Sequence, residues 1–186
     1  MEPPFERRSD HELLGAAADE AEAFAVFYRR YERLVLGFGM LRASNAETAA
    51  DVLAETFAAA WLGRDRYSGG EAGAGPWLLG IARNNLRMRA RRLRVERQAR
   101  DRLGVEPFAV AHEHLREIEA IFSDADAWLE ALPPLQRDAV RAHILDGEDY
   151  LSLAERLGVP EATARKRVSR GIAGLRRRLS HEGDLT

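Results

Sequence analysis

The chain has 186 residues, of which 46% are hydrophobic, and its formal net charge is −2. It has no cysteine, which excludes disulfide frameworks, thiolate zinc sites and cysteine nucleophiles, and its five histidines form no spacing typical of a metal site. Because no apolar run approaches the roughly 20 residues of a membrane span and the start lacks the apolar stretch of a secretory signal, we expect a cytoplasmic protein without membrane contact.

Hydrophobic residues recur with helical period along nearly the whole chain, without strand-like alternation, so the sequence predicts an all-α fold. The first long helix has an aromatic-rich face, because Phe24, Phe27 and Phe38 lie at helical steps. The stretch Ser44–Glu47 has the pattern of a capping box and predicts the start of a second helix, which ends near Gly63.

An acidic ridge, formed by Glu47, Asp51 and Glu55, lies along one side of the second predicted helix. Like-charge pairs four residues apart each destabilise a helix by about 0.2–0.5 kcal/mol. Carboxylates repel DNA, so a ridge without compensating bases indicates a basic protein partner. An ordinary solvated helix surface is the alternative.

The next segment, residues 67–75, contains four glycines and is predicted to be a non-helical loop, here called the glycine loop.

A third helix is predicted from Pro76, because proline suits a first turn. One face of this helix carries four arginines: Arg83, Arg87, Arg91 and Arg94. Trp77 and Asn84 lie along the border of that face. Such a surface is typical of binding to a strand whose bases are partly unstacked, although Trp77 also fits a core position.

These helices predict a first domain over residues 10–95. Residues 96–123 are charged, contain Pro107 and have weak periodicity, so they are predicted to form a linker that can include helical turns. A second apolar pattern begins at Trp128 and predicts a compact helical domain over residues 124–180.

The second domain contains the pattern of a helix-turn-helix. Ala154 is small where two helices cross, and Gly158 can adopt the left-handed conformation that ends the first of them. Helical geometry places five apolar residues of the next helix in one stripe: Ala164, Val168, Ile172, Leu175 and Leu179. The opposite face and its flank, here called the reading face, carry Thr163, Lys166, Arg167 and Arg170. This arrangement suits a DNA major groove, and the alternative is a helical hairpin with a basic surface.

Four blocks, taken in order, resemble the extracytoplasmic-function sigma factors of bacterial RNA polymerase. They are DVLAETFAAAW (51–61), WLLGIARN (77–84), LPPLQRDAV (132–140) and the helix-turn-helix of residues 150–169. The resemblance covers most of residues 20–180. It implies two small helical domains, similar to sigma regions 2 and 4, joined by a charged linker. It also implies a non-enzymatic subunit that directs core polymerase to specific promoters by recognising and melting promoter DNA.

The resemblance implies three sets of site residues and no cofactor. Polymerase binding is expected at Glu47, Asp51 and Glu55. Contacts to the minus-ten element are expected from Tyr67, Trp77, Arg83, Asn84, Arg87 and Arg91. Contacts to the minus-thirty-five element are expected from Thr163, Lys166, Arg167 and Arg170. The implied partners are promoter DNA and core polymerase, through its flap and the clamp coiled coil of its largest subunit. An anti-sigma protein is a further candidate, because many members are held inactive by one.

Two other classes of function compete with this interpretation. A dimeric helix-turn-helix regulator predicts palindromic sites and a stable dimer, but it leaves the acidic ridge and the glycine loop without a role. An enzyme requires a catalytic constellation, and the sequence has no paired carboxylates with metal-ligand spacing, no evident nucleophile with a histidine partner and no phosphate-binding glycine signature. Because the rest of the chain is acidic, we also expect the free protein to bind promoter DNA weakly.

Overall fold

The computed structural model describes residues 4–43, 45–70, 73–103 and 125–182, and every regular element within these ranges is helical. The predicted all-α class is therefore confirmed. The first domain contains η1 (Phe5–Arg7), α1 (Asp10–Ala16), α2 (Ala21–Arg42), α3 (Ala46–Leu62), η2 (Arg64–Arg66) and α4 (Gly75–Leu103). The second contains α6 (Ala125–Glu130), α7 (Pro134–Val140), the π-helical segment η3 (Arg141–Asp146), α8 (Tyr150–Leu157) and α9 (Glu161–Glu182).

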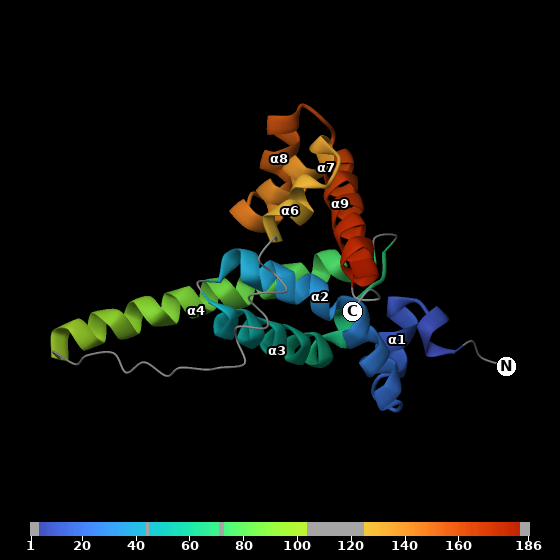
Figure 1. The fold of residues 1–186 in the computed structure, drawn as a ribbon, viewed down its shortest axis with the longest axis horizontal. Coiled ribbons are helices and arrows are strands. Elements are labelled where there is room, and N and C mark those ends of the chain that lie inside the picture. Colours follow the sequence, from blue (N-terminus) through green and yellow to red (C-terminus); the bar gives the residue numbers. More distant parts are fainter. Residues whose placement is uncertain (1–3, 44, 71–72, 104–124, 183–186) are drawn as a thin grey trace.

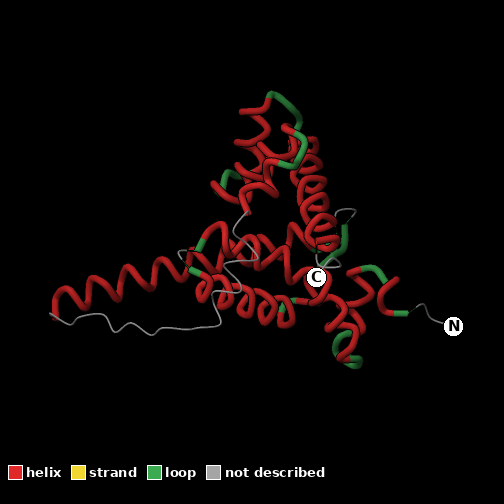
Figure 2. The backbone as a smooth tube through the Cα atoms, viewed as in Figure 1, coloured by secondary structure: helices red, strands yellow, loops and turns green. Residues whose placement is uncertain are grey.

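The two helical domains contact each other directly. Helices α2, α3 and α4 pack side by side as the body of the first domain, and α1 packs on α2 (Figure 1). The second domain stands on this body, and α9 reaches both α2 and α4. The C-terminal half of α4 extends away from the body (Figure 2), where residues 91–96 are all exposed.

Aromatic side chains fill the core between α2 and α3. Phe27 is fully buried, and the ring of Phe24 meets that of Trp61 edge to face with centroids 4.9 Å apart. The two helices cross closely at Gly39, where a Cβ atom would lie 3.1 Å from the Cα atom of Ala49. This close crossing keeps α3 in contact with the aromatic face of α2.

The predicted start of α3 is wrong by one residue. Ser44, which we placed at the N-cap, lies outside the described residues. The N-cap is Asn45, whose side-chain oxygen accepts a hydrogen bond of 2.8 Å from the backbone N–H of Thr48. Asparagine and serine stabilise a helix about equally well as N-cap residues, so their intrinsic preferences do not select which of the two caps α3. The packing of the turn selects it.

Helix α4 extends to Leu103. Residues 96–103, which we predicted to lie in a linker that can include helical turns, continue this helix. These residues include Arg, Gln and Ala, which are good helix formers, and neither Gly nor Pro interrupts them before Gly104. The rest of the predicted linker, residues 104–123, lies outside the described residues.

The core of the second domain depends on close helix crossings. The predicted apolar stripe of α9 is buried along its whole length, which confirms the helical periodicity. Gly171 lets α9 pack against α7, because a Cβ atom there would lie 2.5 Å from Val140. Ile172 continues this core toward the first domain, where it packs against Gly75 at the start of α4. The buried apolar residues of both domains therefore form one cluster.

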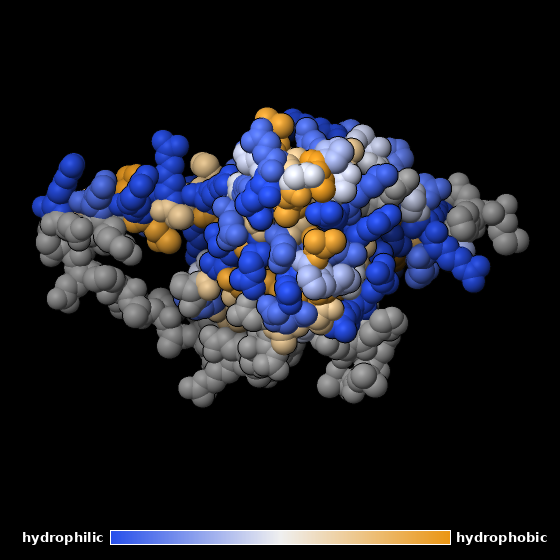
Figure 3. Space-filling view, turned by 90° about the horizontal axis from the view of Figure 1, so that it is seen from above, coloured by the Kyte–Doolittle hydropathy of each residue, from blue (hydrophilic) through white to orange (hydrophobic). Residues whose placement is uncertain are grey.

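The surface of the molecule is mainly polar. Figure 3 shows hydrophilic side chains over most of one face, with hydrophobic side chains scattered among them. None of the described helices combines the length and the apolar character that a bilayer span requires.

Candidate nucleic-acid and polymerase interfaces

The helix-turn-helix forms as the sequence predicts. Asp149 caps α8 by accepting 3.0 Å hydrogen bonds from two backbone N–H groups, and Gly158 ends α8 with φ 61° in the left-handed region. Within the reading face of α9, Lys166 and Arg170 are exposed, and the other two residues are half-buried. The turn and the buried stripe together leave this basic face outside the core of the second domain.

The acidic ridge on α3 is partly compensated. An Arg89 Nη1 atom lies 2.7 Å from an Asp51 carboxylate oxygen, and the two side chains are 31% and 46% exposed. Our prediction that the ridge lacks compensating bases is therefore wrong at Asp51, because α4 packs on α3 and brings Arg89 beside it. Glu55 is exposed, and Glu47 is half-buried. Half-exposed pairs of this kind contribute little stability, so the ridge remains open to a stronger partner.

Two of the predicted minus-ten arginines face the second domain. Arg83 Nη1 donates a hydrogen bond of 2.5 Å to the carbonyl oxygen of His143 in η3. Burial lowers the pKa of Arg83, and the adjacent charge of Arg87 lowers it further. The Arg87 guanidinium lies against Gly147, where a Cβ atom would come within 2.5 Å of its Nη2 atom. Arg91, one turn further along α4, is exposed.

Trp77 and Asn84 line a different surface, here called the Trp77 groove, of about 480 Å³. Arg66 and Asn85 also line it, and the sequence reading did not select them. Arg66 immediately precedes the glycine loop and Asn85 follows Asn84, so adjacency in sequence was the available signal. The structure therefore divides the predicted minus-ten set between two surfaces.

Tyr67 packs against Trp77 on the buried side of the Trp77 groove. Its side chain is 8% exposed, and its ring centroid lies 5.2 Å from that of Trp77. Burial raises the pKa of Tyr67 to about 12, and the charge of Asp10 adds to this effect. The phenol therefore keeps its proton at neutral pH, and Tyr67 lies behind Trp77 rather than on the open surface.

Residues 27–96 match the family described as Sigma-70 region 2, and residues 124–175 match the family described as Sigma-70, region 4. The chain is also 30% identical over 175 residues to the ECF RNA polymerase sigma factor SigM of Mycobacterium tuberculosis (strain ATCC 25618 / H37Rv), a match that covers 94% of this chain and 86% of SigM. This chain belongs to the ECF sigma factors. It is an RNA polymerase sigma factor for promoter-specific transcription initiation, with core RNA polymerase and promoter DNA as partners.

Further relatives include the ECF sigma factor SigK of Mycolicibacterium vanbaalenii, which is 27% identical over 173 residues, covering 89% of this chain and 86% of SigK. Similar solved structures include the RsbN–BldN complex, at TM-score 0.36 and 24% identity, over 89% of this chain and 97% of that chain. CnrH in complex with the cytosolic domain of CnrY is similar at TM-score 0.39 and 20% identity, over 94% and 99%.

In this sigma factor, the reading face lies beside the glycine loop. A cavity of about 520 Å³ between them is lined by Gly70 of the loop and by Lys166, Arg170 and Arg177 of α9, among others. Basic side chains of α9 thus line a cavity that the first domain also borders, and on α4 Arg83 donates to η3 of the second domain. Among the described residues, no three His, Asp or Glu side chains are grouped as a metal site.

Proposed function

We propose that this sigma factor divides promoter recognition among three surfaces. The acidic ridge of α3 binds the clamp coiled coil of the largest polymerase subunit. The Trp77 groove and the glycine loop hold the melted non-template strand of the minus-ten element. The reading face of α9 contacts duplex DNA at the minus-thirty-five element, and the second domain also meets the flap.

Charge supports the first surface. Glu55 is exposed, and Asp51 is held only by a half-exposed ion pair that a basic partner can replace. The carboxylates would repel a DNA backbone, so a protein ligand fits this side of α3 better than nucleic acid.

The Trp77 groove supports the second surface. It combines an aromatic ring, the side-chain amides of Asn84 and Asn85 and the cationic Arg66 along one open depression. Stacking of a base on an aromatic side chain stabilises single-strand binding by about 1–3 kcal/mol. Extruding a base from a duplex costs a few kcal/mol, so one stacked base with hydrogen bonds to the amides offsets much of that cost.

The third surface is supported by the helix-turn-helix geometry. The reading face follows directly after the turn at Gly158, where recognition helices present their first turns to base edges. Arg177 and Arg178 are exposed near the other end of α9 and are placed for phosphate contacts. Neutralising several phosphates makes binding steeply dependent on salt.

The proposal extends to how and where the chain acts. It acts by binding alone, in the cytoplasm with the polymerase. Residues 10–95 serve polymerase and minus-ten binding, residues 96–123 serve as the linker, and residues 124–180 serve minus-thirty-five binding. Part of the linker continues α4, which gives the connection a rigid first segment.

The observation that carries this proposal is that a chain matching sigma regions 2 and 4 presents the acidic ridge on α3, the Trp77 groove around α4 and the reading face on α9 as three separate surfaces. The test is run-off transcription with core polymerase and a promoter library. We expect Asp51→Arg with Glu55→Arg to abolish polymerase binding, whereas Glu22→Arg, the same change on exposed α2 surface, leaves it intact. Lys166→Ala with Arg170→Ala should blur only the upstream preference. Unchanged transcription by both double variants would overturn the assignment.

We also propose an anti-sigma protein as a partner. Its support is the family resemblance alone. Co-purification with the full chain, followed by addition of the captured protein to reconstituted holoenzyme, tests it: an anti-sigma protein lowers transcription from every promoter that this sigma factor uses. A captured protein that leaves transcription unchanged would contradict the proposal.

A further inference from the structure

Helix α1 lies outside both family matches, yet it is firmly held on the first domain. Ser9 caps it, and the Glu12 carboxylate accepts a hydrogen bond of 2.6 Å from the backbone N–H of Ser9. Leu13 and Leu14 are 0% and 2% exposed in the core beneath it. The first residues of α1 therefore have a fixed position beside the glycine loop.

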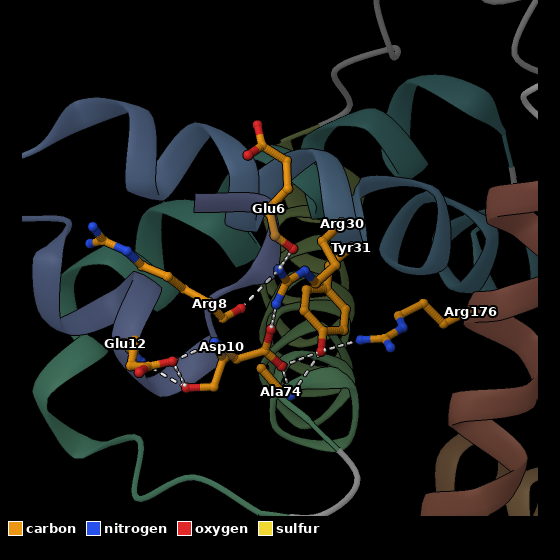
Figure 4. Close-up of polar contacts among 9 residues, drawn as sticks. Glu6, Arg8, Asp10, Glu12, Arg30, Tyr31, Ala74 and Arg176 are labelled. Carbon is orange, nitrogen blue, oxygen red and sulfur yellow. Dashed lines mark hydrogen bonds and ion pairs between the residues drawn. The ribbon is translucent and has the colours of Figure 1, made fainter. Parts of the chain in front are cut away.

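Asp10 joins α1 to the end of the glycine loop. Its carboxylate is 7% exposed, and one oxygen accepts a hydrogen bond of 2.5 Å from Arg30. The other oxygen accepts hydrogen bonds from the Tyr31 hydroxyl and, at 2.8 Å, from the backbone N–H of Ala74 (Figure 4). We call Asp10, Arg30, Tyr31 and Ala74 the Asp10 cluster. Ala74 immediately precedes α4, so this cluster fixes the end of the loop.

His11 holds the start of the same loop. Its Nδ1 atom lies 3.3 Å from the carbonyl oxygen of Tyr67, and because a carbonyl only accepts, the histidine donates. Tyr67 in turn lies behind Trp77. Successive residues of α1 thus contact the first and last parts of the glycine loop.

Gly73 shows how closely the loop approaches the Asp10 cluster. It has φ +68°, and a Cβ atom there would lie 2.5 Å from the Tyr31 hydroxyl and 2.7 Å from an Asp10 carboxylate oxygen. A side chain at this position would displace either the loop or the cluster. Glycine is therefore required both by the backbone conformation and by the space.

We propose that Asp10 and His11 are positioning residues for minus-ten recognition. They hold Tyr67 and Ala74, at the two ends of the glycine loop, in the positions that these residues keep when DNA binds the Trp77 groove. Loop ends that are already held lose less conformational entropy on binding. This inference rests on the proposed role of the Trp77 groove.

The test uses holoenzyme assembled with the full chain. His11→Ala and Asp10→Asn remove one anchor each, and Gly73→Ala displaces the loop or the Asp10 cluster while both anchoring side chains are retained. Glu22→Gln, on exposed α2 surface, is the control. Open-complex formation is measured on the preferred minus-ten sequence and on single-base substitutions of it. We expect each anchor variant to reduce discrimination about tenfold, the effect of one lost hydrogen bond, with core-polymerase affinity and upstream preference unchanged.

The outcomes separate the two proposals. Wild-type holoenzyme that ignores the minus-ten bases would overturn the role of the Trp77 groove. Wild-type discrimination that survives in folded His11→Ala and Gly73→Ala would overturn the positioning role alone. If Asp10→Asn unfolds, these two variants still decide the question, because His11 is exposed and both variants retain the Asp10 carboxylate and its Arg30 partner.

Discussion

Each domain carries one of the proposed nucleic-acid surfaces, but the reading face of α9 needs one helix whereas the Trp77 groove needs several elements. On α9, helical period alone separates the buried stripe from Lys166 and Arg170. The groove combines residues of α3, η2 and α4, and α1 holds the neighbouring loop. A surface on one helix survives small shifts in packing, whereas a surface built from several elements depends on each of them. The first domain is therefore the one in which distant substitutions should change DNA recognition.

The largest expected effect concerns the core that the two domains share. Phe27→Ala removes a fully buried ring from α2 and should lower the free energy of unfolding by about 3–5 kcal/mol. Because the buried apolar residues form one cluster, we expect a single urea transition that shifts as a whole. Two separate transitions, with only one of them moved, would show that the domains fold independently.

Alanine substitution of two glycines, one in each domain, compares how closely their helices pack against neighbouring elements. Gly171→Ala places a methyl group 2.5 Å from Val140 and should destabilise the second domain by about 1–3 kcal/mol. Gly15→Ala in α1 meets nothing within 4 Å and should stabilise the first domain by about 0.5–1 kcal/mol. Thermal unfolding of both variants measures the difference. Equal shifts would contradict the close α7–α9 crossing.

The helix caps of the two domains differ in how their contribution to stability depends on pH, because one is an asparagine and the other an aspartate. Asn45→Ala removes the cap of α3 and should cost about 1 kcal/mol at any pH. In the second domain, hydrogen bonds from Ser152 lower the pKa of the capping Asp149 below 3.8. A carboxyl group whose pKa is lower in the folded state stabilises the fold at pH values above its unfolded-state pKa. This stabilisation is lost as pH falls through the folded-state pKa. Helicity measured between pH 6 and pH 3 should therefore fall less in Asp149→Asn than in wild type.

The smallest effect concerns His143, beneath the contact with Arg83. Burial lowers the pKa of His143 below 6.5, and the charges of Arg83 on α4 and Arg165 on α9 lower it further. The nearby Asp149 and the carbonyl of Glu148 oppose these effects, and the ring of Tyr150 stacks on the histidine at 3.8 Å. Because the unfolded chain binds the proton more readily, stability is full above about pH 6.5 and falls as pH drops through the unfolded pKa.

Stability curves at pH 7.5 and pH 5.5 measure this effect, and His143→Gln should remove that part of the difference. A pH dependence that His143→Gln leaves unchanged would contradict this role of His143.

Several features followed from the sequence alone. The aromatic face of α2, the turn at Gly158, the end of α3 at Gly63 and the buried stripe of α9 are local patterns that one helix or turn determines. The sequence predicted a linker that can include helical turns over residues 96–123, and its first eight residues are the last turns of α4, because good helix formers continue to residue 103. Local signals therefore identified the elements and the basic faces, but not their neighbours.

Only the tertiary structure decided which side chains meet. Asp51 pairs with Arg89 across two helices, and Arg83 points to η3 rather than to solvent. Asp10 meets Ala74 from 64 positions earlier in the chain. Helical period assigns a residue to a face of its own helix, but the partner opposite that face is set by how the helices cross. The sequence by itself therefore determined what this sigma factor is, and the packing decided which of its surfaces are open.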